Sequence, residues 1–268
     1  MVHLRTILEV ARQTVRLQLQ NRLFLLQLLA LFGVGALAFL IGFNADGDLT
    51  GRQLFCVLSW WLVAIVLAPW GTIYFAVQAV HGDIEDRTFV YLFARPVSRA
   101  ALLFGKWLGV AAMSAATAMV GTAFVYIGSA LHGGLWREGH EPRLLVAVAV
   151  AMGLLAVGYA AVGAAFGAYF KRPLLWGAAF VVLGGVVLPM MPLKAGIRAI
   201  TVADPVRRLV LEAIEPDRHL AHMIGPYQRD SHVEPGQPVL NLGVIVAVAL
   251  LLALASYCRN EYDSRERE

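Results

Sequence analysis

The chain has 268 residues, of which 59% are hydrophobic and only 15% are charged, and its mean hydropathy is +0.68. A soluble domain carries roughly 25% charged residues, so the composition excludes a soluble protein and predicts that most of the chain is buried in lipid. The net charge is +4, but the basic residues lie in short connections between apolar runs. That placement favours membrane orientation over nucleic-acid binding.

Residues 1–22 have the pattern of an amphipathic helix. Apolar side chains recur at helical spacing, at Leu4, Ile7, Leu8, Ala11 and Val15. Arginines occupy the other side, so we expect the helix to lie in the membrane interface near anionic headgroups. The apolar run that follows, 23–43, is 21 residues long and shows no small-x-small cleavage site. It predicts the first transmembrane helix rather than a signal peptide.

Five further apolar runs predict transmembrane helices at 54–80, 107–131, 144–170, 174–191 and 239–257. The second span contains Pro69 and Gly71, which indicate a tilt or a kink. The fourth contains Gly163 and Gly167, a GxxxG pair that allows another helix to approach closely. The sequence therefore predicts an all-α membrane protein with one six-helix transmembrane domain, 23–258, and a charged tail, 259–268.

The longest polar segment is the connection 193–238. Asp204 and Pro205 are typical of a helix start, the carboxylate as cap and the proline in the first turn. We expect about eleven residues of amphipathic helix, ending at Pro216. This helix could seat a partner protein, lie on the outer leaflet, or cap a dimer. Three histidines of the same connection lack a metal-binding context, so no metal site is predicted; they are His219, His222 and His232.

Orientation follows from the basic residues of the connections. Most lie before the first span, between spans two and three, between spans four and five, and in the tail. All four segments share one side of a six-span protein. The positive-inside rule therefore predicts that both termini are cytoplasmic and that 193–238 is extracytoplasmic.

Charges gather in an ordered pattern only between spans two and three, in the segment 81–109. The segment begins with acidic residues, continues with an aromatic run, and ends with basic residues. Its members are Asp83, Glu85 and Asp86, then Phe89, Tyr91 and Phe93, and the basic set Arg87, Arg95, Arg99 and Lys106. Exposed aromatic side chains are costly in water, so the segment either docks onto a partner or folds back onto the membrane.

The predicted spans contain no Asp, Glu, Lys, Arg or His. Ion-coupled carriers need such groups near the membrane midplane, which argues against self-powered transport. The polar residues that remain could line a substrate path, although they more often join helices through hydrogen bonds; the candidates are Thr72, Tyr74, Gln78, Thr117 and Tyr126.

Signatures of catalysis are also missing from the sequence. Neither a Gly-x-Ser-x-Gly loop nor His-Glu-x-x-His occurs, and Gly105-Lys106 continues with Trp107, so there is no Walker loop. We therefore predict no catalytic residues and no bound cofactor, and an intramembrane enzyme would need side chains that the sequence lacks.

The segment resembles the signature of ABC-2 type permeases. The resemblance rests on Glu85-Asp86-Arg87-Thr88-Phe89, on Ala94-Arg95-Pro96-Val97-Ser98-Arg99 and on Gly105-Lys106 at the start of the third span. One departure is Arg87, where the family usually has glycine. The layout is also similar to the permease of nitrous oxide reductase maturation.

The resemblance implies a half-size permease that works with a second permease chain and two soluble ATPase subunits, which hold ATP and magnesium. It implies a bacterial inner-membrane location and export of an unknown substrate. The residues expected to contact the ATPase are Asp83, Glu85, Asp86, Arg87, Thr88, Phe89, Arg95, Pro96, Ser98 and Arg99. The alternatives are an ATP-driven machine acting on an extracytoplasmic partner at 193–238, and a membrane anchor for the ATPase without transport.

Overall fold

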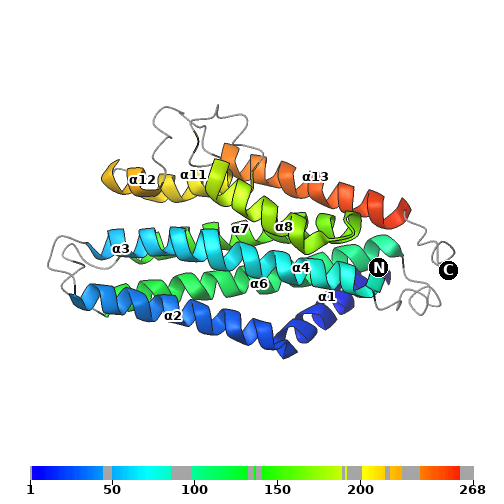
Figure 1. The fold of residues 1–268 in the computed structure, drawn as a ribbon, viewed down its shortest axis with the longest axis horizontal. Coiled ribbons are helices and arrows are strands. Elements are labelled where there is room, and N and C mark those ends of the chain that lie inside the picture. Colours follow the sequence, from blue (N-terminus) through cyan, green and yellow to red (C-terminus); the bar gives the residue numbers. More distant parts are fainter. Residues whose placement is uncertain are drawn as a thin grey trace.

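The computed structural model describes residues 2–44, 50–85, 98–131, 136, 141–188, 191, 201–214, 218–224 and 236–259. Every regular element in these ranges is a helix, as predicted. The helices lie lengthwise in one bundle (Figure 1). In chain order they are α1 (Val2–Gln20), α2 (Arg22–Asn44), α3 (Gly51–Leu58), the π-helix η1 (Ser59–Leu67), α4 (Ala68–Glu85), α6 (Arg99–Ala130), α7 (Pro142–Tyr169), α8 (Pro173–Val181), the π-helix η2 (Val182–Val187), α11 (Ala203–Ile214), α12 (Arg218–Ile224) and α13 (Gln237–Arg259).

Five of the described helical segments are long and apolar enough to cross a membrane: Arg22–Asn44, Gly51–Gly82, Arg99–Ala130, Pro142–Tyr169 and Gln237–Tyr257. They correspond to predicted spans one to four and six. The predicted fifth span, 174–191, coincides with a shorter apolar helix, Pro173–Val187. A helix of that length covers roughly 20 Å, less than a hydrocarbon core of about 30 Å. The count of six spans is therefore not confirmed.

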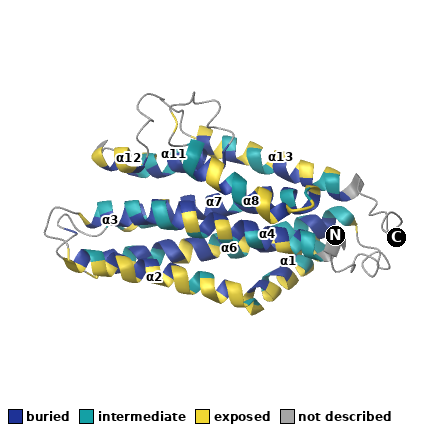
Figure 2. Ribbon diagram, in the orientation of Figure 1, coloured by how far each residue is buried: buried dark blue, intermediate teal, exposed yellow. Residues whose placement is uncertain are grey.

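The core of the bundle is built around α7. Its side chains at Met152, Leu155 and Ala156 are fully buried, and it packs against α4, α6, α11 and α13. Exposed residues, by contrast, follow the outer faces of α2 and α13 (Figure 2). Helix α2 presents leucine and phenylalanine side chains there, as expected of a surface that faces lipid.

The GxxxG pair of α7 packs against α4. A Cβ atom at Gly163 would lie 2.7 Å from the Cβ of Ala76, and one at Gly167 would lie 3.2 Å from the Cβ of Val80. The missing side chains allow the two helices to approach closely, as predicted from the spacing. The sequence alone did not identify α4 as the partner.

The irregularity expected near Pro69 takes the form of a π-helical stretch. Proline has no N–H for the carbonyl four residues before it, and its ring crowds that carbonyl, so the α-helical pattern cannot continue through this point. The turn before the proline is wider, and the N–H of Ala68 donates to the carbonyl of Val63. The Nε2 of Gln27 on α2 donates to the carbonyl of Leu67 at 3.4 Å. The distortion is thus partly compensated by a neighbouring helix.

Helix α11 begins and ends close to the bounds expected from Asp204-Pro205 and Pro216. Its apolar side chains Val206, Val210 and Ile214 are almost completely buried, because α11 packs against α7 and α13. This chain's own helices therefore cover the apolar face of α11, which is not free to bind another protein or lipid.

Several segments meet at one end of the bundle, which we call the link end. The Nδ1 of His81 near the end of α4 donates to the carbonyl of Gly167 near the end of α7 at 3.2 Å. The hydroxyl of Ser256 near the end of α13 donates to the carbonyl of Ala168 at 2.8 Å. Helix α1 begins at the same end, and α12 lies toward the other (Figure 1). The connection predicted between spans two and three leaves and re-enters the bundle at the link end.

Candidate functional site: the base of the link between α4 and α6

The residues expected to contact an ATPase fall partly within the described structure. Asp83 and Glu85 are in the last turn of α4, and Ser98 and Arg99 begin α6. The remaining candidates lie outside the described residues; they are Asp86, Arg87, Thr88, Phe89, Arg95 and Pro96. The structure therefore defines the two ends of the link, and the base on which it stands.

Helix α6 begins at Ser98 for local reasons. Ser98 has an extended backbone, with φ −69° and ψ 138°, and its hydroxyl accepts a hydrogen bond from the N–H of Ala101 at 3.3 Å. A serine in this position satisfies one of the N–H groups that have no partner inside the helix. The cap fixes the point at which the chain returns from the link into the bundle.

Lys106 joins the two helices that carry the link. Its Nζ donates to the carbonyl oxygen of Ala79 on α4 at 2.6 Å. Hydrogen bonds from a charged donor are about twice as strong as neutral ones. This bond joins the two helices close to the points where the link leaves α4 and enters α6. The bond therefore connects the first turns of α6 with the last turns of α4.

Helix α1 packs against the same part of α6. A Cβ atom at Gly105 would lie 2.7 Å from the Cβ of Val10 and 2.9 Å from the carbonyl oxygen of Ile7. A Cβ atom at Gly109 would lie 2.7 Å from the carbonyl oxygen of Ala11. Only glycine permits this approach without displacing a neighbour. The run Gly105-Lys106-Trp107-Leu108-Gly109 thus fixes α6 to both α1 and α4.

Helix α1 was expected to be amphipathic and to lie in the membrane interface. The structure confirms a helix at Val2–Gln20 and buries Ala11, Thr14 and Gln18. Arg12 and Arg16 are exposed on the other side. The predicted apolar face is therefore only partly packed inside the bundle, because Leu4 and Leu8 are exposed while the polar Thr14 and Gln18 are buried. The location of α1 in the membrane interface stays a prediction.

The structure does not bring the five substrate-path candidates together. Thr72 is fully buried, and its hydroxyl makes no hydrogen bond to any described residue. The hydroxyl of Thr117 donates to the carbonyl of Met113 at 2.8 Å within α6. Tyr74 is half-buried and Gln78 is exposed on α4. A path that includes Tyr74 and Gln78 would follow the outer face of α4.

Tyr126 lies far along α6 from the link end. Its ring packs edge-on against Phe55 with a centroid distance of 5.3 Å, and a tilted contact with Trp136 has the same centroid distance. These contacts give Tyr126 a packing role between α3 and α6. The part of the chain that the structure describes has no group of three or more side chains that could hold a metal; His219 and His222 are exposed on α12, and His232 lies outside the described residues.

These observations define the class: an all-helical membrane protein whose second and third long apolar helices are fixed to each other at the base of a charged link. A family model for ABC-2 family transporter proteins matches residues 8–262. The chain therefore belongs to the ABC-2 transporter family, as the residues of the link indicated. No curated protein matches the sequence. Membership makes the chain the membrane component of an ABC transporter, in which a separate ABC ATPase is the expected partner.

Proposed function

We propose that this chain is the permease subunit of an ATP-driven exporter in the bacterial inner membrane. Two soluble ATPase subunits bind ATP and magnesium, and a second permease chain, most simply an identical copy, completes the membrane part. Both termini and the link are cytoplasmic. The chain has a mechanical role and supplies no catalytic residue.

The observation that best supports this role is the joint at the base of the link. The bond from Lys106 to Ala79 connects α6 to α4, and Gly105 and Gly109 bring α1 onto α6. Helix α4 in turn lies closely against α7 through Gly163 and Gly167. A force applied to the link would pass through these contacts into the core of the bundle.

The link is tested by purification of the tagged chain in detergent with its associated proteins. The link variant combines Glu85→Lys with Arg95→Glu. The control variant combines Glu212→Lys with Arg143→Glu, exposed residues on α11 and at the start of α7, away from the link end. Both variants carry the same charge changes.

We expect an ATPase with a Walker loop, identified by mass spectrometry, to copurify with the wild type and with the control. The link variant should lose it or retain it without stimulated ATP hydrolysis. Absence of any ATPase from folded wild-type protein would contradict the proposal. So would equal losses in the two variants, since the link would then have no special role.

The main alternative is a membrane anchor that holds the ATPase without transport. It predicts the same copurification but no effect of nucleotide on the membrane helices. A machine acting on an extracytoplasmic partner is a second alternative. The described part of the 193–238 connection gives it less support, since the apolar face of α11 is covered by α7 and α13.

A further inference from the structure

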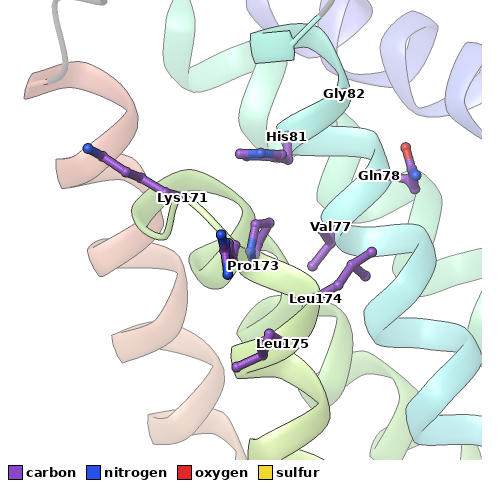
Figure 3. Close-up of a pocket in the computed structure, with 9 residues that line it drawn as sticks. Val77, Gln78, His81, Gly82, Lys171, Pro173, Leu174 and Leu175 are labelled. Carbon is purple, nitrogen blue, oxygen red and sulfur yellow. The ribbon is translucent and has the colours of Figure 1, made fainter.

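A cavity of about 340 Å³ opens at the link end, beside the joint but separate from it. Its volume is within the range of small-molecule sites, roughly 300–1,000 Å³. One wall is α4, and the other is the connection from α7 to α8 together with the first turn of α8 (Figure 3). The lining residues are Val77, Gln78, His81, Gly82, Lys171, Arg172, Pro173, Leu174 and Leu175.

The rim of this cavity is basic. Lys171 and Arg172 are both exposed on the connection that borders the cavity. Figure 3 shows His81 projecting from α4 on the facing wall, whereas the side chain of Lys171 extends away from the cavity. None of the nine lining residues is acidic. Arg172 also precedes the first turn of α8, whose N–H groups receive no side-chain cap there. The N-terminal end of α8 adds partial positive charge to the rim, so the rim is suited to bind an anion.

The remaining wall is aliphatic and continues onto the outer surface of the protein. Val77 is buried at the back of the cavity, whereas Leu174 and Leu175 are 43% and 59% exposed. Trp176, the next residue, is 50% exposed. An apolar surface of this kind on a membrane protein faces acyl chains rather than water.

Aromatic residues mark the level of the headgroups at the same place. The ring of Phe170 stacks on that of Trp176, with centroids 5.1 Å apart, and Tyr169 is highly exposed beside them. Tryptophan and tyrosine are enriched where the hydrocarbon core meets the headgroups. The basic rim thus lies at the boundary at which lipid phosphates are found.

We infer that this cavity binds an anionic phospholipid. Arg172 contacts the phosphate, the exposed side chain of Lys171 turns toward it, and the acyl chains lie along Leu174 and Leu175 on the outer face of α8. Basic pockets between transmembrane helices recognise lipid headgroups through this combination of charge and apolar surface. The bound lipid would connect α4 to the start of α8. A soluble phosphate has the same headgroup chemistry but would make no use of the aliphatic wall.

Native mass spectrometry of the purified chain tests the site with three probes: phosphatidylglycerol, phosphatidylcholine and inorganic phosphate. Wild-type protein should retain phosphatidylglycerol in preference to phosphatidylcholine. In the double variant Lys171→Gln and Arg172→Gln that preference should fall by about ten-fold or more, since each basic residue near lipid phosphates contributes about a factor of five.

The single variant Arg172→Gln should lose about five-fold of the preference. Its matched control is Arg143→Gln, which removes the same charge from an exposed position at the start of α7, away from the link end. It should change the preference by less than about two-fold if binding occurs in the cavity rather than by general attraction. Equal losses in the two variants would overturn the proposal, as would a wild type without preference. Displacement of phosphatidylglycerol by millimolar inorganic phosphate would identify the ligand as a soluble anion and would also refute the proposal of a lipid site.

A second measurement needs no substitution and therefore does not depend on the variants folding. Phosphatidylglycerol with a photoreactive acyl chain is crosslinked to the wild-type protein in liposomes, and the labelled peptides are identified. The label should be enriched at Leu174, Leu175 and Trp176, relative to the same reagent with a choline headgroup. Equal labelling by both reagents would contradict the site.

Discussion

The close packing of α1 against α6 at Gly105 lets the effect of Gly105→Ala on stability be predicted. The added Cβ would lie 2.7 Å from the Cβ of Val10 and 2.9 Å from the carbonyl oxygen of Ile7, so the backbone of α1 has to move. Overpacking of this kind costs about 1–3 kcal/mol. Alanine in place of glycine inside a helix returns about 1 kcal/mol. The net loss of stability should be roughly 0–2 kcal/mol.

The control is Gly33→Ala in α2, where a Cβ would meet no atom within 4 Å. This substitution keeps the gain in helix propensity without the steric cost, so it should stabilise the protein by up to about 1 kcal/mol. The two variants should therefore differ by about 1–3 kcal/mol. A difference of this size corresponds to roughly 2–12 °C in Tm.

Thermal unfolding in one detergent measures both variants against the wild type. The variants have the same change in composition, so a general effect of glycine replacement cancels in the comparison. Equal Tm values for Gly105→Ala and Gly33→Ala would show that α1 does not press on α6. The description of the joint at the base of the link would then be wrong.

Two further predictions concern the core and use the same unfolding measurement. The carboxylate of Asp204 accepts hydrogen bonds at 2.8 and 2.9 Å from two arginines of α11, and it is 2% exposed. Asp204→Asn should lower the free energy of unfolding by about 3–5 kcal/mol, because it leaves the buried arginine charge uncompensated. Glu212→Gln on the exposed side of α11 is its control, and equal effects would show that the carboxylate is not needed. Gly163→Ala should destabilise, because its Cβ would lie 2.7 Å from the Cβ of Ala76. Its control is Gly153→Ala, whose Cβ makes only an ordinary contact at 3.4 Å and which should be neutral or stabilising. A larger loss of stability for Gly153→Ala than for Gly163→Ala would contradict the close approach of α4 and α7.

The long apolar helices could be predicted from the sequence because lipid permits little else. Each backbone polar group in the hydrocarbon core needs an internal partner, so an apolar run of sufficient length forms a helix. Pro69 located the irregularity in the second span for an equally local reason. The run 174–191 was less predictable, because the length of an apolar run does not reveal where its helix ends. The apolar helix described within that run is Pro173–Val187.

The burial of α11 could not be anticipated from its charges. Asp204 was expected only to cap an amphipathic helix, yet its carboxylate and the guanidinium group of Arg207 are each 2% exposed. Arg207 and Arg208 follow Asp204 by three and four residues, so both guanidinium groups reach the same carboxylate. The carboxylate offsets the charge of the buried Arg207, while Arg208 is partly exposed, at 14%. This spacing of the charged residues, beside an apolar face, was the sequence pattern that could have indicated a buried helix.

The candidate sites depend on contacts between distant residues. The link was recognisable from its local pattern, but the bond from Lys106 to Ala79 crosses 27 positions. His81, Lys171 and Arg172 line one cavity, whereas in the sequence the last two only contributed to the basic residues between spans four and five. Such proximity is set by tertiary packing, and no local propensity encodes it.

Hydrogen exchange of the purified complex with its ATPase tests most directly whether this chain is moved by ATP. Exchange at residues 203–214 of α11, which lie away from the link end, is compared with and without ATP and magnesium. We predict that nucleotide changes exchange there in the wild type and that Glu85→Lys with Arg95→Glu abolishes the change. ATP hydrolysis by the wild-type complex without any change in exchange beyond the link end would instead identify the chain as an anchor.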